Sequence, residues 1–222
     1  MRTIDLNADI AEGFDNDFEL MKYLSSVNIC MGFHAGSAEL TEEVVRKSRA
    51  MGLRIGAHVG FPDRQSMGRR ELEEGYPEAW LQSVEHQIRM AGSFAYIKPH
   101  GALFHWLANA PEDSRYLWNA MEEMEKAFMG LPGTGHESQC RRRGLHLICE
   151  GYCERGYDYK GNLIPRTEPG AVLHDLQDIC AQALRLAATV DSICIHGDRP
   201  DAVLVASEVR ETLEREGYKI TA

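Results

Sequence analysis

The stretch that decides the fold is Val27-Asn-Ile-Cys-Met-Gly-Phe-His-Ala-Gly36, in which an apolar run leads directly into glycine and histidine. The segment from Glu39 to Met51 then places apolar residues at helical spacing on one face, which predicts an amphipathic helix. A second β-type run follows from Arg54 to Ala57. A strand, a helix and a strand in this order predict a βαβ unit whose two strands run parallel.

The same alternation extends along the whole chain. Further helical patterns cover Glu78 to Met90, Ser114 to Met129, Leu176 to Ala188 and Ala202 to Glu216. We therefore predict an α/β protein with about seven parallel strands, which either close into a barrel or stay open as a doubly wound sheet. The predicted strands are Thr3 to Leu6, Val27 to Cys30, Arg54 to Ala57, Ala95 to Lys98, Leu145 to Cys149, Ala171 to His174 and Ser192 to His196.

Length and composition indicate one folded domain over residues 1–222. Of the 222 residues, 44% are hydrophobic and 26% are charged, which is usual for globular proteins, and a chain of this length can bury a sizeable core. One interruption stands out. Pro, Gly and polar residues from Leu131 to Cys140 predict a mobile loop inside the domain.

The net charge of −10 argues against nucleic acid as a partner, because it repels a phosphate backbone. The basic run from Arg141 to Arg143 is interpreted as a solvated loop. No signal peptide or membrane-length apolar stretch is visible, and the six cysteines form no C-x-x-C pair. We therefore expect a cytoplasmic protein with reduced thiols and no membrane contact.

Polar and charged groups follow nearly every predicted strand. Because the carboxyl ends of parallel strands meet at one rim, we expect these side chains to converge on an active site there. The candidates are Asn7, Asp9 and Glu12 after the first strand, His34 after the second, His58 and Asp63 after the third, Lys98 and His100 after the fourth, Glu150 and Arg155 after the fifth, Arg166 before the sixth, and His196 and Asp198 after the seventh.

Each candidate also has a purely structural interpretation. A single histidine after a strand is commonly hydrogen-bonded to backbone without any chemical role. Asp5, Asn7 and Asp9 could close turns through nearby backbone amides. Glu150 and Arg155 could pair with each other. Four histidines at four strand ends together favour a functional site.

Separate motifs occur in one order from Asp5 to about Arg210, and through them the chain resembles the LamB/YcsF family. The motifs are Asp5-Leu-Asn-Ala-Asp-Ile-Ala-Glu-Gly-Phe14, Gly32-Phe-His-Ala-Gly36, Gly56-Ala-His58, Gly68-Arg-Arg70, Lys98-Pro-His-Gly-Ala-Leu103, Glu150-Gly-Tyr-Cys-Glu-Arg155, Gly161-Asn-Leu-Ile-Pro-Arg166 and His196-Gly-Asp198. Ala11 stands where the family usually has glycine, and Val59 where it has proline. Neither departure removes a candidate catalytic group.

The resemblance implies a distorted (β/α)7 TIM-like barrel of the glycoside hydrolase/deacetylase type. It also implies hydrolytic ring opening of 5-oxoproline to L-glutamate, coupled to ATP hydrolysis. Family members act with two partner subunits, B and C, which are thought to phosphorylate the lactam oxygen first. The sequence has no G-x-x-x-x-G-K-[ST] loop, which fits ATP chemistry residing largely on those partners. Direct ATP contact and a homo-oligomer stay open.

Opening a lactam requires an activated water, a stabilised oxyanion and a proton for the departing nitrogen. Asp9 is the leading candidate for the general base, and His58 and His100 for polarising the carbonyl or protonating the amine. Lys98, Arg69 and Arg166 are suited to hold a carboxylate or phosphoryl group. The other residues expected to bind substrate are Asn7, Glu12, His34, Glu150, His196 and Asp198.

Two further functions stay open. Histidine and aspartate at strand ends also hold hydrolytic zinc or manganese in deacetylase-like barrels, with Asp9, His34 and His58 as conceivable ligands here. The chain would then be a metal-dependent carbohydrate or amide deacetylase. The third function is that of a noncatalytic ligand-binding subunit.

Overall fold

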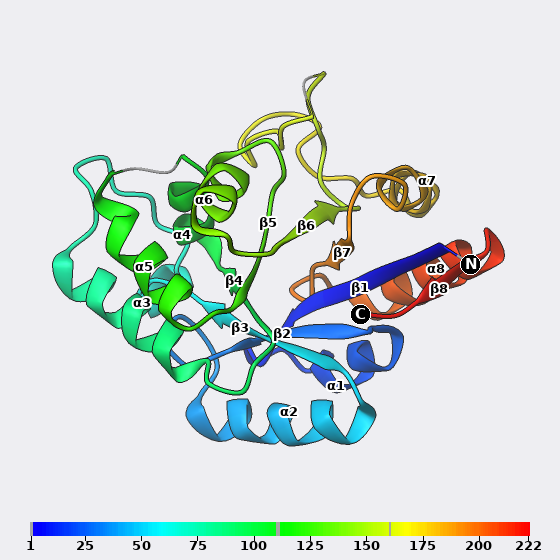
Figure 1. The fold of residues 1–222 in the computed structure, drawn as a ribbon. Coiled ribbons are helices and arrows are strands. Elements are labelled where there is room, and N and C mark those ends of the chain that lie inside the picture. The colour runs from blue at the N-terminus through cyan, green and yellow to red at the C-terminus, as the bar shows by residue number, and fades with distance from the viewer. Residues whose placement is uncertain (1, 110–111, 160) are drawn as a thin grey trace.

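The computed structural model describes residues 2–109, 112–159 and 161–222, and it consists of a closed barrel of parallel strands surrounded by helices (Figure 1). β1 pairs with both β2 and β7, which closes the ring, while β8 (Tyr218–Ile220) adds to the start of β1 outside it. The predicted α/β class is confirmed, and the sheet is a barrel rather than open. The barrel strands are β1 (Arg2–Ile10), β2 (Ser26–Cys30), β3 (Arg54–Val59), β4 (Tyr96–Pro99), β5 (Ala127–Gly130), β6 (Leu147–Tyr152) and β7 (Ser192–Ile195).

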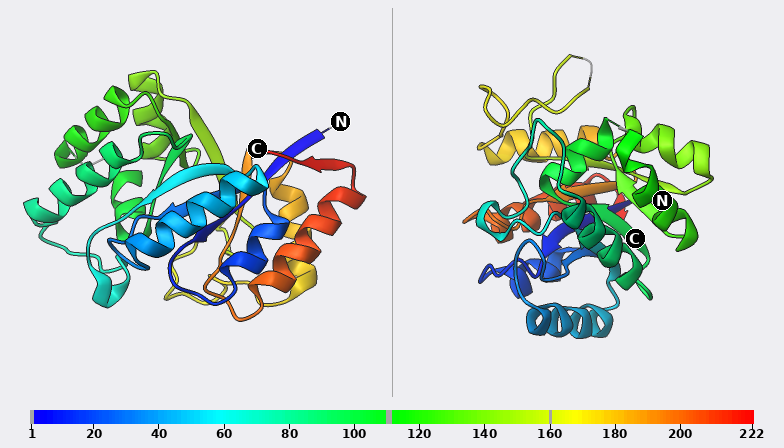
Figure 2. Two further views of the ribbon diagram at one scale, coloured as in Figure 1. Left: turned by 90° about the horizontal axis from the view of Figure 1, so that it is seen from below. Right: turned by 90° about the vertical axis from the view of Figure 1, so that its left-hand side faces the viewer.

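Helices lie outside the ring of strands (Figure 2). The predicted helix α2 has clear ends, because the Ser37 hydroxyl accepts a hydrogen bond from the Leu40 N–H at 3.2 Å and Gly52 ends it at φ 72°. The helices are α1 (Asp17–Leu20), α2 (Ala38–Met51), α3 (Glu78–Met90), α4 (Gly101–Ala108), α5 (Arg115–Glu123), α6 (Gly135–Arg143), α7 (Leu176–Leu186) and α8 (Ala202–Arg215), with short 3₁₀ turns at Met21–Tyr23, Arg64–Ser66 and Glu112–Ser114.

The strand β1 alternates between polar and apolar residues, and its polar side faces the inside of the barrel. In β1 the apolar residues Ile4, Leu6 and Ala8 belong to the core cluster shared with α7 and α8. The residues between them, Asp5 and Asn7, hydrogen-bond to side chains of other barrel strands. Both faces of the strand are therefore buried, but only the outer face is apolar. This arrangement concentrates chemistry in the barrel interior.

Two apolar clusters hold the helices against the strands. One joins β1, β2 and β7 to α7 and α8, and the other joins β3 and β4 to α3, α4 and α5. The second contains a buried indole, Trp118, packed on Phe128 with ring centroids 4.8 Å apart. Phe128 is thus an outward-facing residue of β5.

The predicted helix from Ser114 to Met129 was wrong in its second half. Helix α5 ends at Glu123, Glu125 adopts φ 49°, and Ala127–Gly130 forms barrel strand β5. Four apolar residues after a helix cannot be separated from it by periodicity alone, which explains the error.

The predicted strand from Ala171 to His174 was also wrong. This segment belongs to the long loop after β6, where Val172 forms an isolated antiparallel bridge with Arg155. The count of seven barrel strands was correct only because β5 replaces this segment.

The predicted mobile loop from Leu131 to Cys140 instead contains the start of α6, which is capped by the Thr134 hydroxyl.

The basic run from Arg141 to Arg143, interpreted as a loop, forms the last turn of α6. Arg143 donates hydrogen bonds to Asn119 and Glu122, so it joins two helices. No helix in the described part of the chain is long and apolar enough to span a membrane.

Candidate functional site

The candidate residues come together at the carboxyl end of the barrel, in two groups. The inner cluster lies within the barrel mouth and consists of Asn7, Asp9, Glu12, His34, His58, Lys98, His100 and Glu150. The rim cluster lies on the loops above it and consists of Arg69, Arg166, His196 and Asp198. The two are connected by Tyr152, whose hydroxyl donates to Glu150 at 2.7 Å and whose ring stacks on His196.

Strand register explains why the inner cluster assembles. Asp9 of β1 lies opposite Asn28 of β2, and His58 of β3 lies opposite Lys98 of β4. Each of these pairs occupies the same level near the strand ends. Glu12 and His34 follow their strands in the next loops and extend the cluster outward.

Lys98 is the centre of the inner cluster. Its Nζ lies 2.9 Å from Asp9 Oδ1 and 2.8 Å from Glu150 Oε1, and it donates hydrogen bonds to Asn7 Oδ1 and Cys194 Sγ at 3.3 Å. Its side chain is only 2% exposed. Glu150 Oε1 is within ion-pair distance but lies outside hydrogen-bonding geometry. Two hydrogen bonds and two ion pairs therefore surround this buried ammonium group with protein atoms.

A hydrogen-bonded network continues below Lys98 into the barrel. Asn28 Nδ2 donates to Asn7 Oδ1 at 2.7 Å and to Asp9 Oδ1 at 2.9 Å, and the Tyr96 hydroxyl donates to Asn28 Oδ1. At the bottom, Asp5 accepts hydrogen bonds from three serine hydroxyls. Asp5 therefore has the internal structural role that an acid within a strand suggests. The network fixes the position of Asp9.

Opposing electrostatic effects set the ionisation of the central pair. Burial alone would raise the pKa of Asp9, but His58 and Lys98 outweigh it and hold that pKa well below its usual range. Burial alone would lower the pKa of Lys98, but Asp9, Cys194 and Glu150 raise it well above its usual range. Both groups are therefore charged at neutral pH.

Three histidines surround the Glu12 carboxylate. Glu12 Oε1 lies 3.4 Å from His100 Nδ1, 3.5 Å from His34 Nε2 and 3.8 Å from His58 Nε2. His58 Nε2 and His100 Nδ1 are 2.8 Å apart, and His34 stacks on His100 with centroids separated by 4.1 Å. One donor atom from each of these four residues lies within 4.8 Å of all the others, so the group could hold a metal ion.

Two of these histidines are neutral at neutral pH. Burial, followed by the neighbouring His58, lowers the pKa of His34 well below its usual range. Burial, followed by His34 and His58, does the same for the pKa of His100. Cys30, 3.3 Å from His34, keeps its proton because burial raises the pKa of the thiol to about 12.

The rim cluster is more exposed. Arg69 Nη2 pairs with Asp198 Oδ2 at 2.8 Å, and Arg166 Nη2 lies 3.3 Å from His196 Nε2. Burial would raise the pKa of Asp198, but Arg69, His196 and Arg166 together lower it. Both guanidinium groups therefore act on the Asp198 carboxylate.

Two residues named from the sequence lie outside both clusters. Arg155 donates to the carbonyls of Ala171 and Ile164, so it holds the loop after β6 and does not pair with Glu150. Asp63 pairs with Arg70 at 3.1 Å.

Sequence reasoning missed several residues of the site. Glu154 is buried and accepts hydrogen bonds from the His196 ring and backbone, and it also pairs with Arg199. Asn28, Tyr152 and Cys194 line the barrel around Lys98. Tyr152 and Glu154 lie in the Glu150–Arg155 motif, so that motif could have identified them as site residues. Asn28 and Cys194 lie within apolar strands, and no sequence pattern marks them.

Glycines make room for the site. A Cβ at Gly60 would lie 2.6 Å from His34 Nδ1, and one at Gly56 would lie 2.1 Å from the Tyr96 ring. The glycines of the segment Gly56-Ala-His-Val-Gly60 therefore permit close approach of two side chains.

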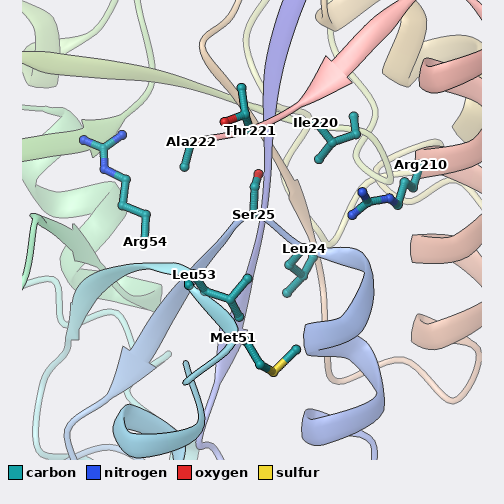
Figure 3. Close-up of a pocket in the computed structure, with 10 residues that line it drawn as sticks. Leu24, Ser25, Met51, Leu53, Arg54, Arg210, Ile220, Thr221 and Ala222 are labelled. Carbon is teal, nitrogen blue, oxygen red and sulfur yellow. The ribbon is translucent and has the colours of Figure 1, made fainter. Parts of the chain in front are cut away.

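Two open hollows lie away from this site. One, of about 390 Å³, is formed at the amino ends of the strands, where Arg54 and Arg210 stand on opposite sides of Ser25 (Figure 3). None of the inner or rim cluster residues lines it. We therefore place the candidate site by its chemistry and not by the size of a hollow.

A closed ring of parallel strands enclosed by helices defines a TIM-like barrel. A solved peptidoglycan deacetylase, PdaC from Bacillus subtilis, shares this fold at a TM-score of 0.52 and 11% identity, over 99% of this chain and 87% of that one. The sequence profile of the LamB/YcsF family matches residues 4–222. The chain belongs to the LamB/YcsF family.

Relatives in this family carry informative names. A protein of Thermus thermophilus, named as the A subunit of 5-oxoprolinase, is 35% identical over 248 aligned residues, covering 99% of each chain. The crystal structure of a lactam utilization protein, also from Thermus thermophilus, superimposes with a TM-score of 0.81 at 32% identity, again over 99% of each chain.

Proposed function

We propose that this chain is the ring-opening subunit of a 5-oxoprolinase, which hydrolyses the lactam of 5-oxoproline to L-glutamate in a reaction coupled to ATP hydrolysis. It acts with two partner subunits, B and C, that carry most of the nucleotide chemistry. The names of the relatives support the substrate and the role within a complex. The proposal rests on the observation that the ionised carboxylate of Asp9 contacts both Lys98 and His58 at the barrel mouth.

Asp9 is the general base of the proposed reaction. Its side chain is 17% exposed, whereas Lys98 and His58 beside it are almost fully buried, so Asp9 is the member of this group that a water molecule can reach. Its low pKa keeps it deprotonated at neutral pH, the state that a proton acceptor needs. After water attacks the lactam carbonyl, the same carboxyl group returns the proton to the departing nitrogen.

Lys98 positions Asp9 in this proposal and does not hold the substrate. Its ammonium lies between two carboxylates and donates hydrogen bonds to Asn7 and Cys194, and its side chain is buried. Its charge keeps Asp9 ionised and its ion pair fixes the carboxylate plane. The role of an anion-binding group, considered for Lys98 from the sequence, therefore passes to the rim cluster.

The rim arginines bind the substrate carboxylate in this proposal. Arg69 and Arg166 are exposed and lie around Asp198 and His196, on the solvent side of the inner cluster. A guanidinium can hold a carboxylate by two parallel hydrogen bonds. The lactam carbonyl would then point toward Asp9.

All six cysteines are free thiols, which supports a place in the reducing cytoplasm.

Reconstitution with the B and C subunits tests the proposed function. We expect ATP-dependent glutamate formation only when all three proteins are present. Asp9→Asn, which keeps the shape of the side chain, should lower kcat by roughly 10²–10⁴-fold, the usual contribution of general base catalysis. Asp15→Asn, at a nearby exposed position, is the control and should be fully active. Full activity of Asp9→Asn would exclude Asp9 as the base.

A second function is favoured by the Glu12 and histidine group, which could hold a metal ion. A metal-dependent amide or carbohydrate deacetylase would hydrolyse its substrate without partners or ATP, and chelation would abolish that activity. Binding of 5-oxoproline with no turnover in any mixture would instead indicate a noncatalytic role.

A further inference from the structure

We propose that Glu12, His34, His58 and His100 bind one divalent transition-metal cation, with Zn²⁺ as the representative ion. This set differs from the ligands conceivable from the sequence, because Glu12 and His100 join it and Asp9 does not. The proposal concerns binding alone, so it does not depend on which amide the protein hydrolyses.

The hydrogen bonds of two histidines fix which nitrogen faces the site. His58 Nδ1 lies 3.2 Å from the Lys98 carbonyl oxygen, and His100 Nε2 lies 2.8 Å from the Met67 carbonyl oxygen. A carbonyl oxygen can only accept, so each of these nitrogens carries the hydrogen. The other ring nitrogens, His58 Nε2 and His100 Nδ1, therefore face Glu12 and each other. Histidine metal ligands commonly donate their outer N–H to a carbonyl in this way.

These two nitrogens lie beside each other and beside two carboxylates, with His58 Nε2 3.3 Å from Asp9 Oδ2. His58 Nε2 and His100 Nδ1 are 2.8 Å apart, with Glu12 Oε1 at 3.4 Å from the latter. Glu12 Oε1 is buried and accepts no hydrogen bond from the described residues. A cation at the centre of the group would give this buried carboxylate oxygen the partner that it lacks.

The distances fit tetrahedral coordination. With metal–nitrogen bonds of about 2.0–2.1 Å, two ligand atoms of a tetrahedron are about 3.3–3.4 Å apart. Glu12 Oε1 lies 3.4 Å from His100 Nδ1, 3.5 Å from His34 Nε2 and 3.8 Å from His58 Nε2. The 2.8 Å separation between His58 and His100 is too short, so those rings must part by about 0.5 Å, and all four ligand atoms lie within 4.8 Å of one another.

The local charge also favours a divalent cation. Asp9, Glu12 and Glu150 contribute three carboxylates to the inner cluster, and Lys98 is its one ammonium group among the described residues. The carboxylates of the cluster therefore exceed its ammonium group by two charges. Three imidazoles and one carboxylate suit Zn²⁺ and similar ions, whereas Mg²⁺ and Ca²⁺ prefer oxygen ligands. Such a cation lowers the pKa of bound water and polarises a carbonyl.

Metal binding by the full chain tests this inference. Protein purified without a histidine tag is stripped with a chelator, and Zn²⁺ or Co²⁺ is added in calorimetric and absorbance titrations. We expect one equivalent to bind, with the visible spectrum of tetrahedral Co²⁺, and Mg²⁺ in excess should not compete. No stoichiometric binding, or equal competition by Mg²⁺, would overturn the proposal.

Variants assign the site to these residues. Glu12→Gln and His100→Gln should each weaken Zn²⁺ binding roughly tenfold or more. His146→Gln, which removes an exposed imidazole elsewhere, is the matched control and should bind as the native protein does. Circular dichroism checks that each variant is folded. If His100→Gln does not fold, Glu12→Gln still tests the site, because glutamine keeps the shape of the glutamate side chain. Unchanged affinity in a folded Glu12→Gln protein would overturn the assignment.

Discussion

Lys98 Nζ lies 2.8 Å from Glu150 Oε1 in the middle of the barrel, and both side chains are buried from solvent. The pair joins β4 to β6, and Asp9 of β1 completes it from a third strand. A charge pair of this kind is costly to desolvate and is maintained only because each charge has a partner. The barrel interior therefore carries the chemistry of the site and gains less stability than an apolar interior would.

Lys98→Met should unfold at lower denaturant concentration than the native protein. Removing the ammonium leaves Glu150 and Asp9 without their cation, and breaking a buried pair in this way costs about 3–5 kcal/mol. The double variant Lys98→Met/Glu150→Gln removes one orphaned charge and should recover part of that loss. Urea unfolding of the single and double variants measures the coupling. Strict additivity would mean that the two groups do not interact.

Arg69→Gln should impair substrate binding with little effect on stability. Its partner Asp198 is partly exposed, and exposed pairs contribute at most about 1 kcal/mol. In the reconstituted enzyme we expect KM for 5-oxoproline to rise and kcat to change less. Arg70→Gln is the matched control, since the neighbouring Arg70 pairs with Asp63 outside the rim cluster. An equal rise in KM for both variants would contradict the proposed role of Arg69.

Asp17→Asn should remove a pH dependence of folding. Burial raises the pKa of Asp17 to about 6, from an ordinary value of 3.8. Between these two values the folded state binds more protons than the unfolded state, so this group makes the protein less stable as the pH rises.

The asparagine variant should therefore gain stability relative to the native protein from about pH 4 to 7, on the order of 1–3 kcal/mol. Asparagine can still accept the hydrogen bond from the Ala11 N–H that Asp17 Oδ2 accepts at 2.9 Å. Urea unfolding at several pH values measures the difference. If the difference in free energy of unfolding between the two proteins does not change with pH across this range, Asp17 does not titrate as described.

Gly56→Ala should destabilise the barrel. Its Cβ would lie 2.1 Å from Tyr96 Cε2, inside a closed ring of strands where the backbone has little room to move. Overpacking of this kind costs about 1–3 kcal/mol. Replacing the ring as well, in Gly56→Ala/Tyr96→Leu, should restore part of the loss. Thermal unfolding of both proteins provides the comparison, and a fully stable single variant would show that the ring shifts freely.

Local patterns predicted much of the fold. Helix α3 has the predicted bounds, and α2, α7 and α8 differ from theirs by a few residues, because their apolar stripes and end signals lie within one segment. Strand β5 and helix α6 were not predicted. The apolar run of β5 is too short for its period to be distinguished from a helix, and the residues of α6 are nearly all polar.

The sequence by itself determined which residue types stand at the ends of the strands, and hence that a rim with carboxylates and histidines would form. Only the tertiary structure decided their partners. It made Lys98 a buried partner of Asp9 and Glu150, assigned Arg155 to a loop, and brought Glu12 to three histidines. The physical reason is that strand order and register set distances between residues far apart in the chain, and no local pattern contains that information.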